Sequence, residues 1–393
     1  MTIDDYRSIA QVHGSPCYIF DLSSLDKRVS SINAIAGDHF NLCYSIKANP
    51  FLISYMSNNV SCLEVCSPGE LKICMGLHIE PNHILYSGVN KTFNDIDEAL
   101  QYGVRSFTAE SIMQAETLEK CGSLKALNIS CLLRLAADTQ FGMSENDIRS
   151  LLSSRETFPH VSFEGIHYFA GTQRKKLNQQ ISELAMLKDL IFNLRNEYNI
   201  PLPKLEYGPG LSVPLFEGED FSDTLKPFKT LFEAFTEAST WSDLTVEMGR
   251  FFVTECGHYI TRVMDTKSNG DINYAIVDGG INHINYYGSM VGMKNPILDH
   301  IKCDVANTTQ TNWCICGSFC ITSDYIIRKK CFTGLSVDDL LVFHNIGAYS
   351  ITEGLYLFLS RTMPKVLLLN KDGSITIARD FLESYTINTV KNN

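Results

Sequence analysis

Hydrophobic positions along the chain form short apolar runs that alternate with longer polar and amphipathic stretches. The runs that have the length and composition of buried β-strands span residues 41–47, 62–67, 83–88, 106–110, 128–135, 162–169, 204–208 and 244–249. The intervening stretches, such as 178–187, carry apolar residues at helical spacing. Strands that alternate with helices in this number, over about 200 residues, predict an α/β fold with a closed, TIM-type (β/α)8 barrel. A doubly wound open sheet is the competing architecture, since the spacing of the early strands fits either.

The length and spacing of the apolar runs change after Gly249. Shorter strand-like runs follow, separated by turn signals, at residues 274–278, 313–316, 341–343, 366–369 and 374–378. They predict an all-β domain with antiparallel connections, a β-sandwich or small β-barrel. The run Cys17–Asp21 precedes the barrel and can pair with this region. We therefore expect a barrel at residues 24–252 and a β domain built from both chain ends, 1–23 and 253–393.

Composition narrows the classes of function. The 393 residues are 45% hydrophobic, enough for a large core, and their 33 basic and 44 acidic side chains give a net charge of −11. This acidic balance argues against binding to nucleic-acid backbones, although backbone N–H groups and one arginine can still hold a small anion. The 13 cysteines are scattered, without paired CxxC motifs or a secretory signal, which predicts reduced thiols and neither disulfides nor a metal site. No apolar run approaches the ~20 residues of a membrane span, so we expect a cytoplasmic protein.

Polar residues stand at the carboxyl ends of the predicted barrel strands, where barrel enzymes carry their active sites. The first strand closes on Lys47 before an Asn-Pro break, and glycines follow the last two strands in Gly208-Pro-Gly210 and Glu247-Met-Gly249-Arg250. Each feature alone is more often structural, a snorkelling lysine or a plain turn. Together, a lysine, an anion site and a carboxylate are what pyridoxal phosphate requires. Glu247 would keep the cofactor's ring nitrogen protonated, since a neighbouring negative charge favours the charged form.

Several motifs, in this order, resemble the fold-type III pyridoxal-phosphate-dependent decarboxylases, of the ornithine and diaminopimelate type. They are Tyr44-Ser-Ile-Lys47-Ala-Asn, Glu64-Val-Cys-Ser67-Pro-Gly-Glu70, Phe141-Gly142, Glu247-x-Gly249-Arg250, Gly317-Ser-Phe-Cys320-Ile-Thr-Ser-Asp324 and Gly347-Ala-Tyr349. The resemblance implies that Lys47 holds the cofactor through a Schiff base and that Cys320 protonates the substrate carbon once the α-carboxylate has left as CO₂. It also implies a homodimer with shared active sites, because the cysteine of this family comes from the partner subunit.

The remaining site residues are assigned through the same resemblance. Those expected to bind the cofactor, besides Lys47 and Glu247, are Phe169, Thr172, Gly208, Gly210, Gly249, Arg250 and Tyr349. Those expected to bind the substrate are Asp278, Ile321 and Asp324.

The chain departs from the family pattern at positions that bear on the substrate. Phe169 stands where the family has a histidine that stacks on the cofactor ring, and His167 is expected to be only a neighbour. Ile321 stands where members that bind a distal ammonium carry Asp or Glu, and residues 282–292 lack the arginine of the diaminopimelate enzymes. These departures disfavour free diaminopimelate and ornithine. They resemble relatives that decarboxylate conjugated or carrier-bound amino acids in antibiotic, siderophore and modified-peptide pathways.

Four alternatives stay open from the sequence. A diaminopimelate- or ornithine-type enzyme would act on a free basic amino acid, and a non-catalytic homologue that binds the cofactor would have lost Lys47 or Cys320. An amino-acid racemase would carry arginine in place of Glu247. A cofactor-homeostasis protein would share the barrel and lysine but lack the β domain.

Overall fold

The computed structural model describes residues 1–286 and 293–391, and these divide into two compact units. The barrel unit comprises Val29–Val213 and Asp223–Phe251, and the terminal unit comprises Met1–Arg28, Pro214–Ser222 and the chain from Phe252 onward. The sequence led us to expect boundaries at residues 24 and 252, with 214–222 inside the barrel domain. That segment instead joins the terminal unit, where Phe216 bridges to Pro296 and the Glu217 N–H donates to the Asn295 carbonyl (2.9 Å).

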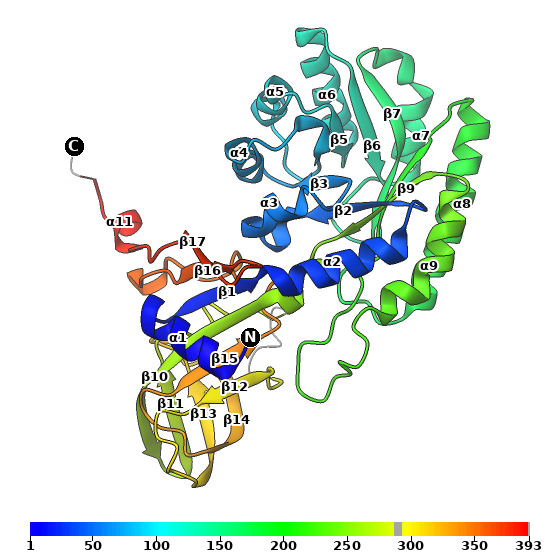
Figure 1. Cartoon of the computed structure of the whole chain (residues 1–393). Helices are drawn as coiled ribbons and strands as arrows, with labels where there is room; N and C mark the ends of the chain where they lie inside the picture. Colours follow the sequence, from blue (N-terminus) through cyan, green and yellow to red (C-terminus); the bar gives the residue numbers. More distant parts are fainter. Residues whose placement is uncertain (287–292, 392–393) are drawn as a thin grey trace. The chain divides into compact units, whose positions relative to one another are not determined.

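The barrel unit contains a closed barrel of eight parallel strands (Figure 1). The strands are β2 (Asn41–Ser45), β3 (Cys62–Val65), β4 (Ile84–Tyr86), β5 (Ser106–Ala109), β6 (Ile129–Arg134), β7 (Val161–Phe169), β8 (Lys204–Gly208) and β9 (Asp243–Met248). The last strand pairs with the first, Cys43 opposite Glu247, so the sheet closes. This confirms the predicted (β/α)8 architecture and excludes the open sheet.

The barrel's helices begin at residues whose side chains cap them. Ser67, Thr92, Ser111 and Ser144 accept hydrogen bonds from backbone N–H groups three residues on, which satisfies donors that a helix start leaves free. The helices around the barrel strands are α2 (Leu22–Ala36), α3 (Ile53–Met56), α4 (Pro68–Gly76), α5 (Phe93–Tyr102), α6 (Ile112–Lys125), α7 (Glu145–Ser153), α8 (Leu177–Tyr198), α9 (Lys226–Ser239) and α10 (Arg250–Val253), with 3₁₀ turns η1 (Ile46–Ala48), η2 (Pro50–Leu52), η3 (Pro81–His83) and η4 (Arg155–Thr157).

The terminal unit is built on a mixed sheet, which within the described residues has nine strands. They are β1 (Cys17–Asp21), β10 (Gly257–Asn269), β11 (Ile272–Val277), β12 (Leu298–Ile301), β13 (Gln310–Cys316), β14 (Tyr325–Thr333), β15 (Leu340–His344), β16 (Lys365–Leu369) and β17 (Ile375–Arg379). The main path runs β14-β13-β11-β10-β1-β16-β17, with β15 paired to β10 and β12 paired to β15. The expected pairing of Cys17–Asp21 with this region is confirmed, since β1 lies between β10 and β16.

The terminal unit also corrects two expectations. The connections are not all antiparallel, because β1 runs parallel to β16 and β11 runs parallel to β13. The unit is not all-β either, since residues 3–13 form a helix, α1 (Ile3–His13). Tyr6 and Ile9 of this helix lie in the same hydrophobic core as Ile19 of β1. The other short elements are η5 (Thr254–Cys256), η7 (Phe358–Ser360) and α11 (Tyr385–Asn388). None of the helices in the described ranges combines the length and apolar character that crossing a membrane demands.

Candidate active site

Lys47 lies just beyond the carboxyl end of β2, where the strand gives way to the turn η1. The break follows from the sequence, because the Asn49 side chain accepts a hydrogen bond from the Phe51 N–H at the start of η2. The Lys47 Nζ donates to Glu64 Oε2 at 2.7 Å and lies 3.7 Å from Glu247 Oε1. The lysine side chain is 39% exposed and that of Glu64 only 3%. The amine therefore stands at the barrel mouth over a buried acidic floor.

Glu247 is the buried carboxylate of this floor. Ser45 Oγ donates to its Oε1 at 2.6 Å, and His167 Nε2 donates to its Oε2 at 3.1 Å. Burial alone raises the pKa of the Glu247 carboxyl, but the Lys47 ammonium and the bonds from His167 and Ser45 outweigh it and hold the pKa well below its usual value. Glu247 is therefore ionised at neutral pH.

His167, which the sequence led us to expect as only a neighbour of the site, contacts Glu247 directly. The ring is buried on β7, its Nε2 faces the carboxylate, and its Nδ1 has no hydrogen-bond partner among the described residues. The Phe169 ring instead covers Gly208 at the end of β8, where an added Cβ would lie 2.6 Å from Phe169 Cδ2. Strand alternation could have predicted the contact between His167 and Glu247. His167 is two residues before Phe169 on β7, and residues two apart on a strand face the same side of the sheet. The stacking role of Phe169 stays a prediction.

The Glu64-Val-Cys66-Ser67-Pro-Gly-Glu70 motif fixes Glu64 against the lysine. The Cys66 thiol donates to Glu64 Oε1 (3.2 Å), and the Cys66 N–H donates to Glu70 Oε2 (2.7 Å). Ser67 Oγ accepts from the Glu70 N–H at 3.2 Å, which anchors the motif on the start of α4. The motif thus holds one carboxylate in place through a continuous chain of hydrogen bonds.

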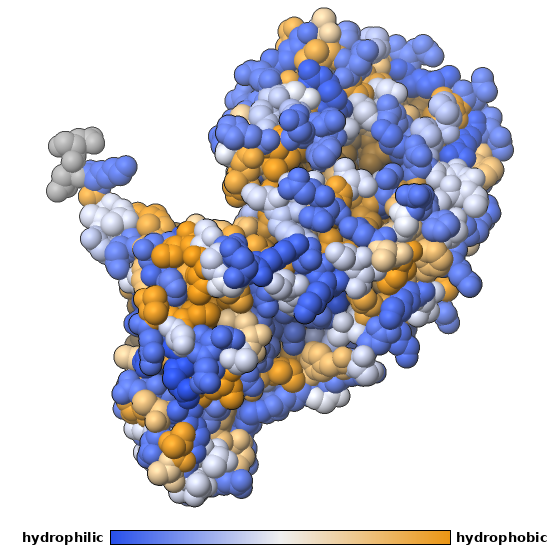
Figure 2. Space-filling model, viewed as in Figure 1, coloured by the Kyte–Doolittle hydropathy of each residue, from blue (hydrophilic) through white to orange (hydrophobic). Residues whose placement is uncertain are grey.

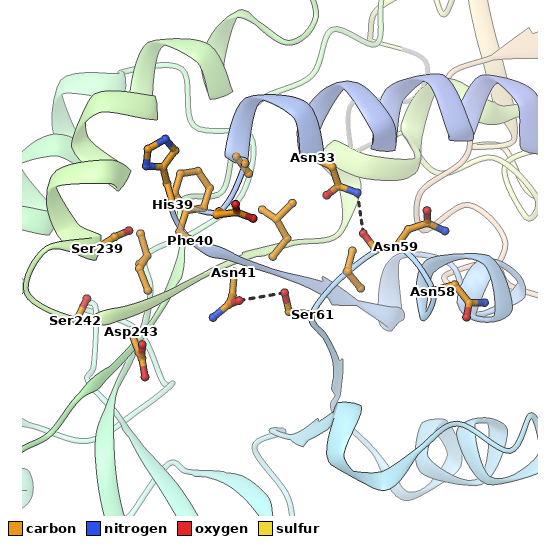
Figure 3. A pocket seen from close by; sticks show the side chains of 16 residues that line it. Asn33, His39, Phe40, Asn41, Asn58, Asn59, Ser61, Ser239, Ser242 and Asp243 are labelled. Carbon is orange, nitrogen blue, oxygen red and sulfur yellow. Dashed lines mark hydrogen bonds between the residues drawn. The ribbon is translucent and has the colours of Figure 1, made fainter.

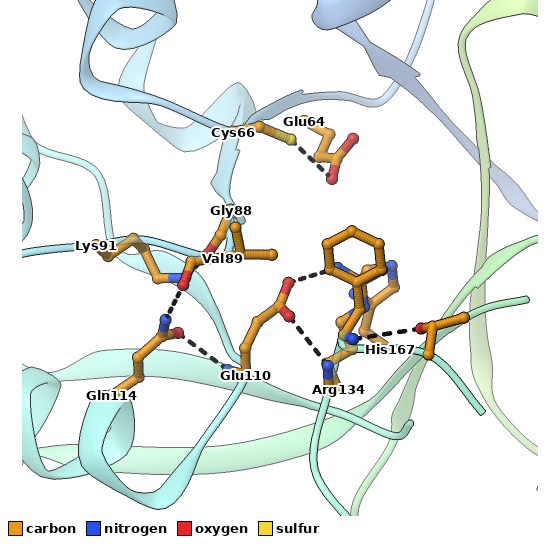
Figure 4. A network of polar contacts seen from close by, with 12 residues as sticks. Glu64, Cys66, Gly88, Val89, Lys91, Glu110, Gln114, Arg134 and His167 are labelled. Atoms are coloured by element: carbon orange, nitrogen blue, oxygen red, sulfur yellow. Dashed lines mark hydrogen bonds and ion pairs between the residues drawn. The ribbon is translucent and has the colours of Figure 1, made fainter. Parts of the chain in front are cut away.

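A second polar network lies at the ends of β5 and β6 (Figure 4). Arg134 forms a buried ion pair with Glu110, whose other oxygen accepts the Gly142 N–H at 3.0 Å. The Arg134 guanidinium also lies 5.0 Å from the centre of the Phe141 ring. Because Glu110 pairs with it, the charge of Arg134 is already balanced within the protein.

Lys91 lies near this network. Burial lowers the pKa of Lys91 to about 8, and its Nζ donates to the Gly88 carbonyl at 2.5 Å.

The glycine-rich turn after β8 is packed too closely to accept a side chain. Gly210 has φ +60°, and a Cβ there would lie 1.7 Å from the Gly171 carbonyl oxygen. Pro209 contributes no N–H, and its carbonyl accepts from Gln180 Nε2 at 3.1 Å. The loop that contains Gly171 and Thr172 therefore lies directly against the turn at Gly210. Close backbone approach of this kind is what an anion cradle needs.

Two further residues expected at the anion site lie at the end of the last barrel strand. Gly249 is half-buried directly after β9, and Arg250 is buried at the start of α10. Tyr349 lies in the terminal unit, half-buried with φ +67°. The phosphate contacts of these residues stay predictions.

Cys320 lies on the loop between β13 and β14 of the terminal unit and is exposed. Asp324 anchors this loop, because its Oδ2 accepts the Phe319 N–H at 2.8 Å and its Oδ1 accepts the Ile281 N–H at 3.0 Å. Burial raises the pKa of Asp324 despite these two bonds. The hydrogen bonds to Asp324 therefore fix the loop that carries the exposed Cys320 thiol. Ile321, the next residue, is half-buried.

Asp278 is committed to contacts inside the terminal unit. Its Oδ1 accepts from Thr261 Oγ1 at 2.5 Å and its Oδ2 from Ser15 Oγ at 2.5 Å. The substrate-binding roles of Asp278, Ile321 and Asp324 stay predictions, and the geometry gives the two aspartates an additional structural role. Residues 287–292, part of the stretch in which the sequence lacks an arginine, lie outside the described residues.

A cavity of about 610 Å³ lies at the opposite end of the barrel (Figure 3). Its lining includes Asn41 and Asp243, the first residues of β2 and β9, and Asn33 and Asn59, which are joined by a hydrogen bond. No residue predicted for catalysis or cofactor binding lines it. Because barrel active sites occupy the carboxyl ends of the strands, this cavity is not the active site.

Comparisons with known proteins agree with this geometry. Residues 22–254 match the profile of the family described as "Pyridoxal-dependent decarboxylase, pyridoxal binding domain". The chain belongs to this family. It is an enzyme, an amino-acid decarboxylase that depends on pyridoxal phosphate.

Curated relatives of this decarboxylase span nearly its whole length. The 2-[(L-alanin-3-ylcarbamoyl)methyl]-2-hydroxybutanedioate decarboxylase of Staphylococcus aureus is 26% identical, over 92% of this chain and 96% of the relative. The L-glutamyl-[BtrI acyl-carrier protein] decarboxylase of Niallia circulans is 23% identical, over 93% and 91%. Diaminopimelate decarboxylase of M. jannaschii, solved with L-lysine, has a TM-score of 0.85 at 19% identity, over 98% of this chain and 94% of that chain, which shows the shared fold.

The residues of the barrel unit fit the cofactor. Lys47 offers an amine at the barrel mouth, Glu247 is an ionised acid for the ring nitrogen, and the turn at Gly210 leaves no room for side chains beside a phosphate. When bound, pyridoxal phosphate supplies an electron-accepting ring. A protonated ring nitrogen accepts electrons best, and an ionised Glu247 favours that protonated form.

Proposed function

We propose that this decarboxylase removes the α-carboxylate of an amino acid carried within a larger conjugate or on a carrier, rather than that of a free basic amino acid. The observation that carries the proposal is Ile321. An ammonium on the substrate's far end needs a carboxylate partner, and an isoleucine at this place offers none. The names of the two curated relatives, one a conjugate and one a carrier-bound glutamyl group, support the same substrate class.

The proposed chemistry divides among three residues. Lys47 would hold the cofactor through its side-chain amine. Glu247 would keep a proton at the ring nitrogen, where the cofactor supplies an electron-accepting ring. Cys320 then delivers a proton to the substrate's α-carbon. Its exposed position on the anchored β13–β14 loop supports this role, because a thiol that reaches substrate must stand clear of its own core.

We further propose a homodimer in which each active site takes its cysteine from the partner subunit. Large apolar side chains remain exposed in the C-terminal part of the terminal unit, where Figure 2 shows apolar surface. They include Leu357, Phe358, Leu359, Phe381 and Leu382. Clusters of this kind on a protein surface mark protein interfaces. The thirteen cysteines are all free, which supports a reducing, cytoplasmic location.

The substrate proposal is tested by measuring CO₂ release. The panel compares free diaminopimelate, ornithine and lysine with amide conjugates of amino acids and with aminoacyl groups on a carrier thioester. We expect release from one or more conjugates and little from the free basic amino acids. The matched variant is Ile321→Asp, which restores a carboxylate and should raise kcat/KM for a free diamine acid. Fastest turnover of free diaminopimelate by the parent would refute the proposal.

The shared site is tested by mixing two inactive variants, Lys47→Ala and Cys320→Ala. Mixed dimers regain activity if the two residues come from different subunits, because one of the two sites then contains both. If both residues come from one chain, every site in the mixture stays defective and no activity returns. In Cys320→Ala alone, cofactor binding should persist, and loss of the cofactor would mean that Cys320 is structural.

A further inference from the structure

Glu206 is a buried carboxyl group that the proposed chemistry does not use. It lies on β8 with 2% of its surface exposed, and neither of its oxygens has a hydrogen-bond partner within residues 1–286 and 293–391. Its Cα is paired with that of His167 on β7 and that of Thr245 on β9. Paired residues of neighbouring strands face the same side of a sheet, as do residues two apart on one strand. Glu206 therefore faces the barrel interior together with His167 and Glu247.

The two carboxyl groups differ in what surrounds them. Glu247 receives hydrogen bonds from Ser45 and His167 and lies near the Lys47 ammonium, whereas Glu206 receives none from the part of the chain that the structure describes. A buried carboxylate without donors is strongly disfavoured, and two carboxylates in one interior disfavour each other's charge. Burial, followed by the negative charge of Glu247, raises the pKa of Glu206 well above its usual value. Glu206 is therefore the neutral acid of the pair.

The groups that face Glu206 come from every side of the interior. They are Glu247 on β9, Cys62 and Glu64 on β3, Cys43 on β2, Lys47 on η1 and His167 on β7. Two cations lie on this side, Lys47 and Lys204, which lines the same cavity as Glu206. Glu64 already engages Lys47 at 2.7 Å and Glu164 engages Lys204 at 2.5 Å, so a second full negative charge at Glu206 would compete with carboxylates that already pair with these cations.

A cavity of about 140 Å³ at the amino ends of the strands is lined by Glu206 together with Cys62, Ser130 and Thr245. Its lining is mainly apolar, with Ile84, Phe107 and Leu132 among its residues, and its volume leaves room for a water molecule beside the few polar groups. A carboxyl group that borders such a cavity has a path along which to exchange its proton with solvent.

We propose that Glu206 is a positioning residue of the active site: it occupies the barrel interior as the neutral acid, which leaves Glu247 as the ionised one, and a negative charge on Glu206 switches the site off. A negative charge at Glu206 raises the affinity of Glu247 for a proton. A cofactor bound there would then face a Glu247 that takes up a proton more readily itself. Glu206 acts through Glu247 and touches neither cofactor nor substrate.

The pH dependence of kcat/KM tests the proposal in the holoenzyme. Glu206→Gln keeps the shape and stays neutral at every pH. We expect it to remain within about threefold of the parent at pH 7, and its alkaline decline to move up by about one pH unit or more. Glu206→Asp keeps an ionisable acid and should retain the alkaline decline. A Glu206→Gln profile that coincides with that of the parent would overturn the proposal.

Infrared spectroscopy of the apoprotein tests the protonation state without turnover. The parent at neutral pH should show the C=O stretch of a carboxylic acid that Glu206→Gln lacks and Glu206→Asp shifts. The control is Thr108→Val, which removes another unpartnered polar group from the barrel unit and should change neither the band nor the pH profile. Absence of a carboxylic acid band assignable to Glu206 would show an ionised side chain and overturn the proposal. If Glu206→Gln does not fold, the Glu206→Asp shift decides.

Discussion

The hydrogen bond from Ser45 to Glu247 offers a direct measure of how the protein keeps this carboxylate ionised. Both residues are buried, the bond is 2.6 Å long, and it is given to a charged acceptor. Bonds of this kind are worth about 1.5–3 kcal/mol. Ser45→Ala removes the donor and leaves Glu247 with His167 and Lys47. We expect the pKa of Glu247 to rise by about one to two units towards its usual value.

The sign of the effect on stability follows from linkage. A carboxyl group whose pKa is lowered in the folded protein adds stability above its unfolded pKa, and that stability is lost as the pH falls through the folded value. Ser45→Ala should therefore destabilise the apoprotein by about 1.5–3 kcal/mol at pH 7, and this difference should shrink only in acid, as the pH falls through the lowered pKa of Glu247 and the carboxylate is protonated in both proteins. At about 2–4 °C per kcal/mol for a domain of this size, the thermal midpoint falls by about 3–12 °C at pH 7.

The assay is thermal unfolding of the apoprotein across this pH range, with Ser54→Ala as the control because Ser54 is an exposed serine of the same unit. The acid limb of kcat/KM in the holoenzyme should move up by about one to two pH units in Ser45→Ala. If the loss of stability stayed at its pH 7 value in acid where Glu247 is protonated in both proteins, Ser45 would act through packing, and the conclusion that it keeps Glu247 ionised would be refuted.

Three other predictions concern the remaining parts of the site. Lys47→Ala should abolish the absorbance of the Schiff base that the purified enzyme shows with its cofactor; an unchanged spectrum rules out the assignment of the lysine. Gly210→Ala should weaken cofactor binding at least about tenfold, since its Cβ would lie 1.7 Å from a carbonyl oxygen and φ is +60°; Gly76→Ala, with nothing within 4 Å, should bind the cofactor normally in the same titration. Asp324→Asn should lower kcat and speed thiol labelling of Cys320, because one of two backbone N–H groups loses its acceptor; unchanged labelling would mean that Asp324 does not anchor the loop.

The barrel could be predicted from the sequence because its signal repeats. Each strand is a short apolar run, most of the predicted runs end in a polar residue or a glycine, and together the runs indicate a single closed sheet. The candidate site residues at the strand ends, Lys47 and Glu247 among them, were predicted for the same reason. A rule about where barrels carry their active sites turns positions along the chain into neighbours in space.

The terminal unit was harder to predict because its pairings are not local. The parallel pairs β1–β16 and β11–β13 join segments far apart in the chain, which turn signals do not reveal. Helix α1 did carry a local signal, a capping box in which Thr2 and Asp5 each accept the other's backbone N–H, followed by buried residues at helical spacing. That signal was missed because both chain ends were assigned to strands. The segment 214–222 belongs to the terminal unit because Phe216 and Glu217 contact Pro296 and Asn295, which are about 80 residues away in the chain, and no local sequence pattern predicts such contacts.

Two positions of β7 bear on the histidine that stacks on the cofactor ring in this family. That histidine corresponds in position to Phe169, and His167 of this chain, two residues earlier, cannot take its place. Side chains two residues apart on a strand face the same side but lie about 6.6 Å apart along it. Phe169, at the end of β7, covers Gly208 of the glycine-rich turn, whereas His167 lies deeper and reaches Glu247. A phenyl ring at the outer position can only stack, because it has neither charge nor hydrogen-bonding groups. The imidazole at the inner position therefore helps to fix the charge of Glu247, whereas a stacking role for Phe169 at the outer position stays a prediction.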